Sequence, residues 1–212
     1  CPTGIGTPDC PFDSLLSAVV EALIVQDWEG VDPPKRELYL AGGTYDNGTM
    51  PPSLTRPLML LGGYVRDGSL WSRDPESNPT ILSQSGTVAM TGTQEGEGWI
   101  VLDGLEIYGE LQFGGDVVLQ RVHQWKSSTA QTDSFRGTTT STTLWLEDST
   151  LEGDIYASID KSYYGSGSSN WVFNNSTIDG DAGAGRSSAN WRWNGTTLTG
   201  RPMFGTSCAN WV

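Results

Sequence analysis

The sequence has little positive charge. Lys and Arg together number 12 among 212 residues, against 25 Asp and Glu, and the formal net charge is −13. Nucleic acids and anionic membrane surfaces repel such a chain within a Debye length of roughly 10 Å, so we expect no nucleic-acid partner. No apolar run reaches the 18 to 20 residues or so that cross a membrane. The apolar stretch from Leu15 to Val25 is shorter and contains Glu21, and the sequence therefore predicts no membrane span.

Residue types used in catalysis and metal binding are also scarce. His123 is the only histidine, no CxxC pair occurs, and no two Asp residues are adjacent. A catalytic triad or a histidine-ligated metal site would have to use His123, which has no serine elbow or second ligand in view. We interpret His123 as a surface or turn residue, and the sequence assigns no catalytic residue.

Cysteine is rare, and its count is odd. Cys1 and Cys10 lie near one end and Cys208 near the other, so one thiol is left over or joined to another molecule. A chain that starts at Cys1 without an initiator Met fits a processed mature protein, and a lipoprotein modified at that Cys is one explanation. Low lysine, many Thr, Ser, Gly and Trp residues, and several glycosylation sequons indicate an extracellular or cell-surface protein. The sequons begin at Asn47, Asn174, Asn175 and Asn194.

Only one stretch has a helical pattern. Residues 11–27 begin with Asp13 as a plausible N-cap and place six aliphatic side chains on one stripe; these are Leu15, Leu16, Val19, Val20, Leu23 and Ile24. Short apolar runs at 37–45, 57–65, 78–83 and 87–90, bounded by Gly, Pro, Asn or Asp, predict strands instead. With no helices between them, these strands exclude a doubly wound sheet.

From residue 98 a repeat becomes clear. The segments 99–110, 117–125, 144–154, 171–181 and 191–201 align without gaps. One apolar column contains Leu102, Leu119, Leu146, Phe173 and Trp193, and the column two residues before it contains Ile100, Val117, Leu144, Trp171 and Trp191. A bend follows, with Asp148 and Asn175 on it, and a second short strand starts near Leu151 and Ile178. Period two within each run and loops of variable length between runs predict a solenoid of strands.

Nine tryptophans are many for this length. Trp171, Trp191 and Trp211 share an inward column, so we expect them to stack in the core. Trp145 is out of phase with the inward residues and should face outward. Together with Trp71 and Trp125, it is a candidate for carbohydrate contact or for a subunit interface.

These features resemble a known superfamily. The chain resembles the right-handed parallel β-helices of the pectin-lyase-like superfamily, especially bacterial secreted and surface members. The resemblance lies in the order of its segments: an amphipathic helix, then LYLAGGTYDNG at 38–48, then LMLLGGYVRDGSLWSRDPESNPTIL at 58–82, then repeated strand-bend-strand units. The resemblance implies an all-β fold in a single domain, with a helix in residues 1–30 that plugs the N-terminal end of solenoid rungs spanning 37–212. It leaves activity open, because lyases, hydrolases, adhesins and structural proteins share this architecture.

Acidic residues recur at equivalent places in the repeats. Asp154 and Asp181 should lie above one another on the outer wall, where carboxylates from successive repeats could hold a Ca²⁺ ion. The simpler reading is a solvated acidic face. The sequence therefore predicts no cofactor, with Ca²⁺ at this pair as the one alternative.

The phrases SSNWVF at 168–173, SANWRW at 188–193 and SCANWV at 207–212 indicate a third repeat that begins and stops. An open solenoid end exposes unpaired backbone groups and apolar core. We therefore predict a structural subunit that assembles head to tail into a filament, with an interface formed by Trp211, Val212, Phe204, Leu15 and Val19. Cys208 would bridge to Cys1 or Cys10 of the next copy. The alternatives are a secreted polysaccharide-binding or polysaccharide-lyase-like β-helix and a fragment of a surface adhesin.

Overall fold

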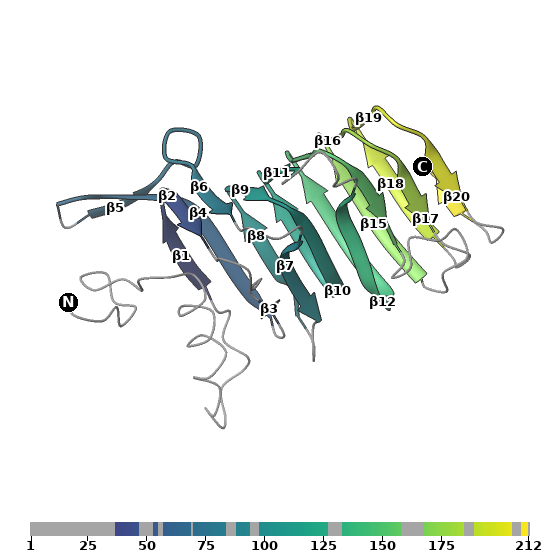
Figure 1. Ribbon diagram of the computed structural model, residues 1–212, viewed down its shortest axis with the longest axis horizontal. Coiled ribbons are helices and arrows are strands. Elements are labelled where there is room, and N and C mark those ends of the chain that lie inside the picture. Colours follow the sequence, from purple (N-terminus) through teal and green to yellow (C-terminus); the bar gives the residue numbers. More distant parts are fainter. Residues whose placement is uncertain are drawn as a thin grey trace, which may run out of the picture.

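The computed structural model describes residues 37–46, 53–54, 57–68, 70–83, 88–93, 98–126, 133–157, 168–184, 189–204 and 209–211. Within these ranges the chain is all-β, without a helix, and all but one pair of strands run parallel (Figure 1). The predicted all-β class is confirmed. The helix expected at 11–27 lies outside the described residues.

The strands form two sheets that run along the long axis of the molecule (Figure 1). The 14-stranded sheet contains β1 (Glu37–Ala41), β3 (Ser53–Leu54), β4 (Leu58–Asp67), β5 (Leu70–Arg73), β7 (Val88–Thr93), β8 (Ile100–Asp103), β10 (Glu110–Gln120), β12 (Asp133–Glu147), β14 (Asp154–Tyr156), β15 (Ser168–Asn174), β17 (Ala182–Ala184), β18 (Ala189–Asn194), β20 (Pro202–Phe204) and β21 (Ala209–Trp211). The 7-stranded sheet contains β2 (Gly43–Asp46), β6 (Thr80–Ser83), β9 (Leu105–Tyr108), β11 (His123–Trp125), β13 (Thr150–Leu151), β16 (Thr177–Ile178) and β19 (Thr197–Leu198).

Each repeat visits the large sheet, the small sheet and the large sheet again. The chain runs from β15 across a bend to β16 and then to β17, and each of these strands pairs in parallel with the equivalent strand of the repeats before and after it. The third strand of each repeat was not expected from the sequence. It is short, and in β10 and β12 it runs without a break into the first strand of the next repeat.

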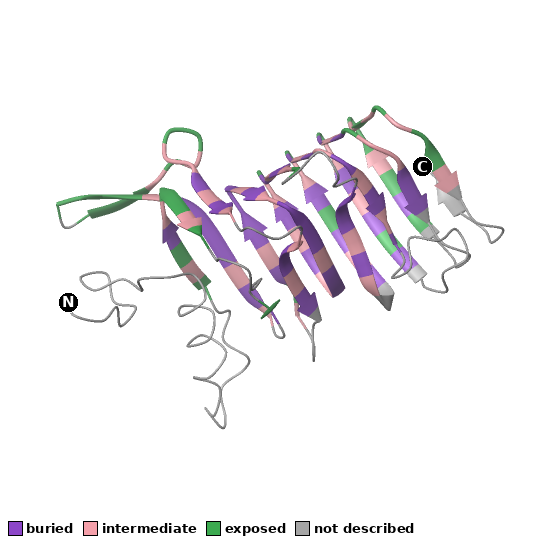
Figure 2. Cartoon of the chain, viewed as in Figure 1, coloured by how far each residue is buried: buried purple, intermediate pink, exposed green. Residues whose placement is uncertain are grey.

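The register of the large sheet is the one that the sequence repeat predicts. Leu119 pairs with Leu102 on one side and with Leu146 on the other, and the column continues through Phe173 to Trp193. Alternate residues of the strands are buried along the stack (Figure 2). The inward columns therefore form one continuous apolar core.

Aromatic rings fill the C-terminal part of this core. Trp171 and Trp191 are buried and stack with 4.8 Å between ring centroids and 5° between ring planes. Phe173 stacks on Trp193 at 4.2 Å, but Trp193 is only partly buried. The expected inward stack is confirmed for Trp171 and Trp191, whereas the side chain of Trp211 lies outside the described residues.

The bends between the two sheets use left-handed backbone. Asp148 and Asn175 both have φ of 47°, Arg121 has φ of 49°, and the equivalent glycines Gly104 and Gly195 have φ of 66° and 60°. Left-handed backbone favours Gly, Asn and Asp. This preference explains the residue types at four of these five bend positions, Arg121 being the exception.

Serine side chains satisfy the buried backbone just after two of the bends. The Ser149 hydroxyl accepts a hydrogen bond from the Val122 amide at 3.0 Å and donates one to the Glu147 carbonyl at 2.7 Å. Ser176 repeats this arrangement with Ser149 and Asn174. These inward positions tolerate a polar residue because its hydrogen bonds are complete.

A hairpin departs from the repeat. The end of β4 pairs antiparallel with β5 across the turn at Gly68, which has φ of 60°, and it projects from the stack (Figure 1). Asp67 pairs with Leu70, so the Gly68-Ser69 dipeptide between the two runs is the hairpin signal that the strand prediction overlooked. The run predicted as one strand at 37–45 is two strands, because the chain bends at Gly42 and passes from the large sheet to the small sheet.

Candidate binding groove on the outer wall

A groove of about 640 Å³ opens along the bends of three successive repeats. Its floor consists of bend residues and the outward residues of β9, β11 and β13. One side consists of Arg73 and the connection between β5 and β6. The lining residues are Arg73, Asp74, Pro75, Glu76, Pro79, Gly104, Leu105, Glu106, Arg121, Val122, His123, Asp148 and Thr150.

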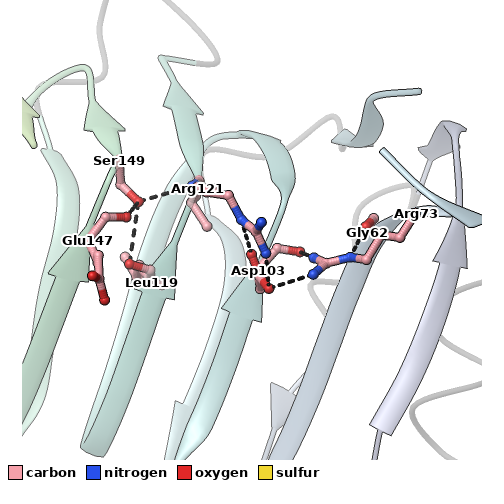
Figure 3. Close-up of polar contacts among 8 residues, drawn as sticks. Gly62, Arg73, Asp103, Leu119, Arg121, Glu147 and Ser149 are labelled. Atoms are coloured by element: carbon pink, nitrogen blue, oxygen red, sulfur yellow. Dashed lines mark hydrogen bonds and ion pairs between the residues drawn. The ribbon is translucent and has the colours of Figure 1, made fainter. Parts of the chain in front are cut away.

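A buried carboxylate lies between two arginines next to this groove (Figure 3). Asp103, at the end of β8, is 5% exposed. Its carboxylate accepts hydrogen bonds from Arg121 Nε at 2.9 Å and Nη2 at 2.6 Å, and from Arg73 Nη1 at 2.8 Å. Burial alone would raise the pKa of Asp103, but the hydrogen bonds and charges of the two guanidiniums outweigh burial and lower that pKa below its usual value.

The two arginines of this cluster differ in what they can still bind. Arg73 uses all three nitrogens within the protein, since Nε donates to the Gly62 carbonyl and Nη2 to the Asp103 carbonyl. Arg121 bonds Asp103 through Nε and Nη2 only, and its side chain is 46% exposed. The hydrogen bond to Asp103 raises the pKa of Arg121. Arg121 is thus a fixed, charged donor that faces the groove.

Acceptors outnumber donors among the charged groups that line the groove. The carboxylates of Asp74, Glu76, Glu106 and Asp148 contribute to the lining, against the guanidiniums of Arg73 and Arg121. Because Arg73 is committed to Asp103 and the backbone, the groove presents one cationic donor among several carboxylate acceptors.

An aromatic wall continues from the groove onto the outer face of the small sheet. Trp125 stacks on His123 with 3.7 Å between ring centroids, and on Tyr108 of the neighbouring strand at 5.9 Å and 11°. His123 Nε2 lies 3.2 Å from Glu152 Oε1. We name Tyr108, His123 and Trp125 the aromatic wall. His123, expected to be a surface or turn residue, is a partly exposed residue of β11 and belongs both to the wall and to the groove lining.

A buried amide holds the backbone beneath this wall. Gln124 occupies the inward column between Ile107 and Leu151. Its Nε2 donates to the carbonyls of Gly109 and Trp125, both at 2.9 Å, and its Oε1 accepts from the Glu152 amide at 3.1 Å. The sequence alignment did not assign a residue of this repeat to that column, because the position is apolar in the other repeats.

The three tryptophans proposed as surface contacts lie on three different elements. Trp145 is on β12 and is 39% exposed, so its expected outward orientation is confirmed. Trp71 is on the hairpin strand β5 and is 40% exposed. Trp125 alone is part of the aromatic wall. A carbohydrate role for each remains a prediction.

Asp154 and Asp181, the pair proposed for calcium, lie next to each other, as the repeat predicted. Their carboxylates, however, accept hydrogen bonds from backbone amides. Asp154 Oδ1 accepts a hydrogen bond from the Asp181 amide at 2.7 Å, and Asp181 Oδ1 accepts one from the Arg201 amide at 2.7 Å. Arg201 Nη2 also lies 3.0 Å from Asp181 Oδ2. Within the described ranges, no three His, Cys, Asp or Glu side chains gather as metal ligands would. Calcium binding at Asp154 and Asp181 stays a prediction.

The assembly residues fall largely outside the described part of the chain. This holds for Cys1, Cys10, Leu15, Val19, Cys208 and Val212. For Phe204 and Trp211, only the backbone pairing of β20 and β21 is described. Among the described residues, no helix has the length and apolar character to cross a membrane.

Arg73, Asp103 and Arg121 were not predicted as a group. The available signal was Arg121 itself, an arginine aligned with Gly104, Asp148, Asn175 and Gly195 at the bend.

Comparison with protein-family models found no match, and comparisons with curated proteins and with solved structures found none either.

Proposed function

We propose that the chain is a right-handed parallel β-helix of an extracellular or cell-surface protein, and that it binds a neutral polysaccharide along the groove. The observation that carries this proposal is the union, on one rigid wall, of a stacked aromatic face with a fixed arginine donor and several carboxylate acceptors. Saccharide hydroxyls donate to carboxylates and accept from guanidinium, while the apolar faces of sugar rings pack on aromatic rings. A ligand site also requires concavity and convergent polar groups, and the groove has both.

The charge of the groove favours a neutral ligand. Asp74, Glu76, Glu106 and Asp148 line it, and the whole chain has a net charge of −13. A uronate or sulfated polymer would meet this field with like charge. Arg121 does not reverse that balance, because Asp103 neutralises part of the charge of the arginine pair.

The repeat sets the direction of the ligand. Glu106, His123 and Thr150 are outward neighbours on three adjacent strands, which are spaced by about 4.8 Å. The groove therefore extends about 10 Å across these strands, and we propose that the polymer runs along the stack rather than along a strand. Successive sugar rings of an extended polymer would then meet successive repeats.

The test measures binding of the whole chain to cellulose, xylan, mannan and β-1,3-glucan, with polygalacturonate as the acidic comparison. We expect a neutral polymer to bind, and we expect Trp125→Ala and Arg121→Ala each to weaken that binding at least about tenfold, since each removes a principal contact of 1.4 kcal/mol or more. The matched control is Trp145→Ala, which removes an outward tryptophan from the large sheet. Retention of polygalacturonate alone, or loss of binding in Trp145→Ala and not in Trp125→Ala, refutes the proposal.

End-to-end assembly is the second candidate function. Trp193 and Leu198 continue columns that are fully buried in the preceding repeats, yet both are only partly buried. Among the described strands, β19, β20 and β21 each pair on one side only. A second copy that stacks on these strands would complete the columns and pair their free edges.

Assembly is tested by negative-stain microscopy and sedimentation of the purified chain under oxidising conditions. We expect filaments that shorten in Cys208→Ser if a disulfide joins the copies. A monodisperse monomer at high concentration refutes assembly, while equally long filaments in Cys208→Ser remove only the disulfide.

A further inference from the structure

The hairpin of β4 and β5 carries a concentration of exposed apolar side chains beside the groove. The described part of the chain has six large hydrophobic residues that are exposed, and four of them lie on the hairpin or on the adjacent strand β1. These four are Tyr39, Val65, Leu70 and Trp71. Exposed apolar clusters of this kind mark interaction surfaces more often than isolated residues do.

One face of the hairpin connects directly to the groove through Arg73. Tyr64 pairs with Arg73 across the hairpin, and Arg66 pairs with Trp71. Since directly opposite residues and residues two apart in a strand share a face, Tyr64, Trp71 and Arg73 lie on the same face. Leu70 lies on the opposite face, as does Val65. Arg73 lines the groove, so this face begins where the groove ends.

The Tyr64 ring on this face contacts both Arg73 and Tyr39. The Arg73 guanidinium lies 5.6 Å from the centroid of the Tyr64 ring, and Tyr64 meets Tyr39 edge to face at 5.0 Å. Arg73 is in turn fixed by Asp103 and Gly62. An aromatic platform therefore extends from the groove toward Trp71, two residues along β5 from Arg73.

We propose that this platform, formed by Tyr39, Tyr64 and Trp71, is a second subsite that binds the continuing chain of a long polysaccharide. The inference rests on the proposed function of the groove. The groove spans only three strands, whereas a polymer that leaves it past Arg73 meets the platform next. Short oligosaccharides fill the groove alone, and longer ones gain stacking contacts on the platform.

The experiment compares a disaccharide with a hexasaccharide by calorimetry, using cellobiose and cellohexaose, and laminaribiose and laminarihexaose in parallel. In the unchanged chain, the hexasaccharide of the series that binds should bind at least tenfold more tightly than its disaccharide. Trp71→Ala should remove roughly three- to tenfold of the hexasaccharide affinity, the range expected for one aromatic contact, and leave disaccharide affinity unchanged. Leu70→Ala is the matched control, because Leu70 is more exposed, is adjacent in sequence and lies on the other face.

The outcomes separate this inference from the proposal on which it rests. Equal affinity for disaccharide and hexasaccharide, or an unchanged length dependence in Trp71→Ala, overturns the platform and leaves the groove intact. Equal losses in Leu70→Ala and Trp71→Ala also overturn it, because they indicate a general effect of the hairpin. Absence of binding by both disaccharides and both hexasaccharides, with no polymer bound either, refutes the groove itself.

Discussion

Asp103→Asn tests the cluster on which the groove depends. The substitution keeps the size of the side chain but replaces a carboxylate, which accepts three hydrogen bonds from two guanidiniums, with a neutral amide. The amide nitrogen must then face an arginine donor. Arg73 and Arg121 would both lose their counterion.

The expected cost follows from how exposed each arginine is. Removing one partner of a buried ion pair costs about 3–5 kcal/mol, and a hydrogen bond to a charged group contributes about 1.5–3 kcal/mol. The Arg121 side chain is 46% exposed, so water would largely replace its lost partner in Asp103→Asn. The Arg73 side chain is 22% exposed and would regain less water. We therefore expect Asp103→Asn to lower the free energy of unfolding by about 2–4 kcal/mol at pH 7.

Urea titration, followed by tryptophan fluorescence and far-UV circular dichroism, measures this change as a shift in midpoint at constant slope. Because the pKa of Asp103 is lowered in the folded chain, its contribution is complete above the unfolded value of about 3.8 and is lost as pH falls through the lower folded value. The difference between the two proteins should narrow progressively below pH 3.8. A variant within about 0.5 kcal/mol of the unchanged chain at pH 7, the usual range for surface substitutions, or a difference that persists in acid, would refute the reasoning.

Three further predictions use the same unfolding measurement. Trp191→Ala should cost about 3–5 kcal/mol, because it leaves a cavity beside the buried ring of Trp171; a cost below about 1 kcal/mol would contradict the stacked core. Gly62→Ala should destabilise the fold strongly, since its Cβ would lie 2.3 Å from the Gly104 carbonyl oxygen. Asn175→Gly should be neutral or slightly stabilising, whereas Asn175→Val should cost about 1–2 kcal/mol, because φ is 47° there; equal stabilities would argue against left-handed backbone.

The inward columns of the parallel sheets could be predicted because they repeat along the sequence. Leu144 and Leu146 recur as Trp171 and Phe173 after 27 residues, and parallel pairing joins those residues. Period two fixes which side chains face inward, and it also placed Trp145 outward. Aligning the repeats is therefore enough to predict which residues pair in the sheet.

The groove could not be predicted in the same way, because its parts come from different kinds of structure. Asp103 lies 30 residues from Arg73 and 18 from Arg121. Arg73 reaches it only because the hairpin of β4 and β5 interrupts the repeat and returns the chain beside Gly62. Gln124 was missed for a related reason, since a polar residue in an apolar column reveals its partners only after folding.

Arg121 occupies a bend position that recurs in every repeat, but its residue type is unusual for that position. In its bend column the equivalent positions are Gly104, Asp148, Asn175 and Gly195, residue types that tolerate positive φ, whereas an arginine with φ of 49° is strained by about 1 kcal/mol or more. Arg121→Asn would relieve that strain while removing one of the two arginine partners of Asp103, and Arg73 would keep the carboxylate paired, so we expect its stability to stay within about 1 kcal/mol of the unchanged chain.

Arg121→Gln should be less stable than Arg121→Asn by about 1 kcal/mol, because it loses the ion pair without relieving the backbone. Both variants should lose polysaccharide binding about equally. In that pattern the backbone conformation determines stability and the guanidinium determines binding. It would show that the strained arginine at this bend contributes to ligand binding and not to stability. Retained binding in Arg121→Asn would instead make the arginine a structural residue.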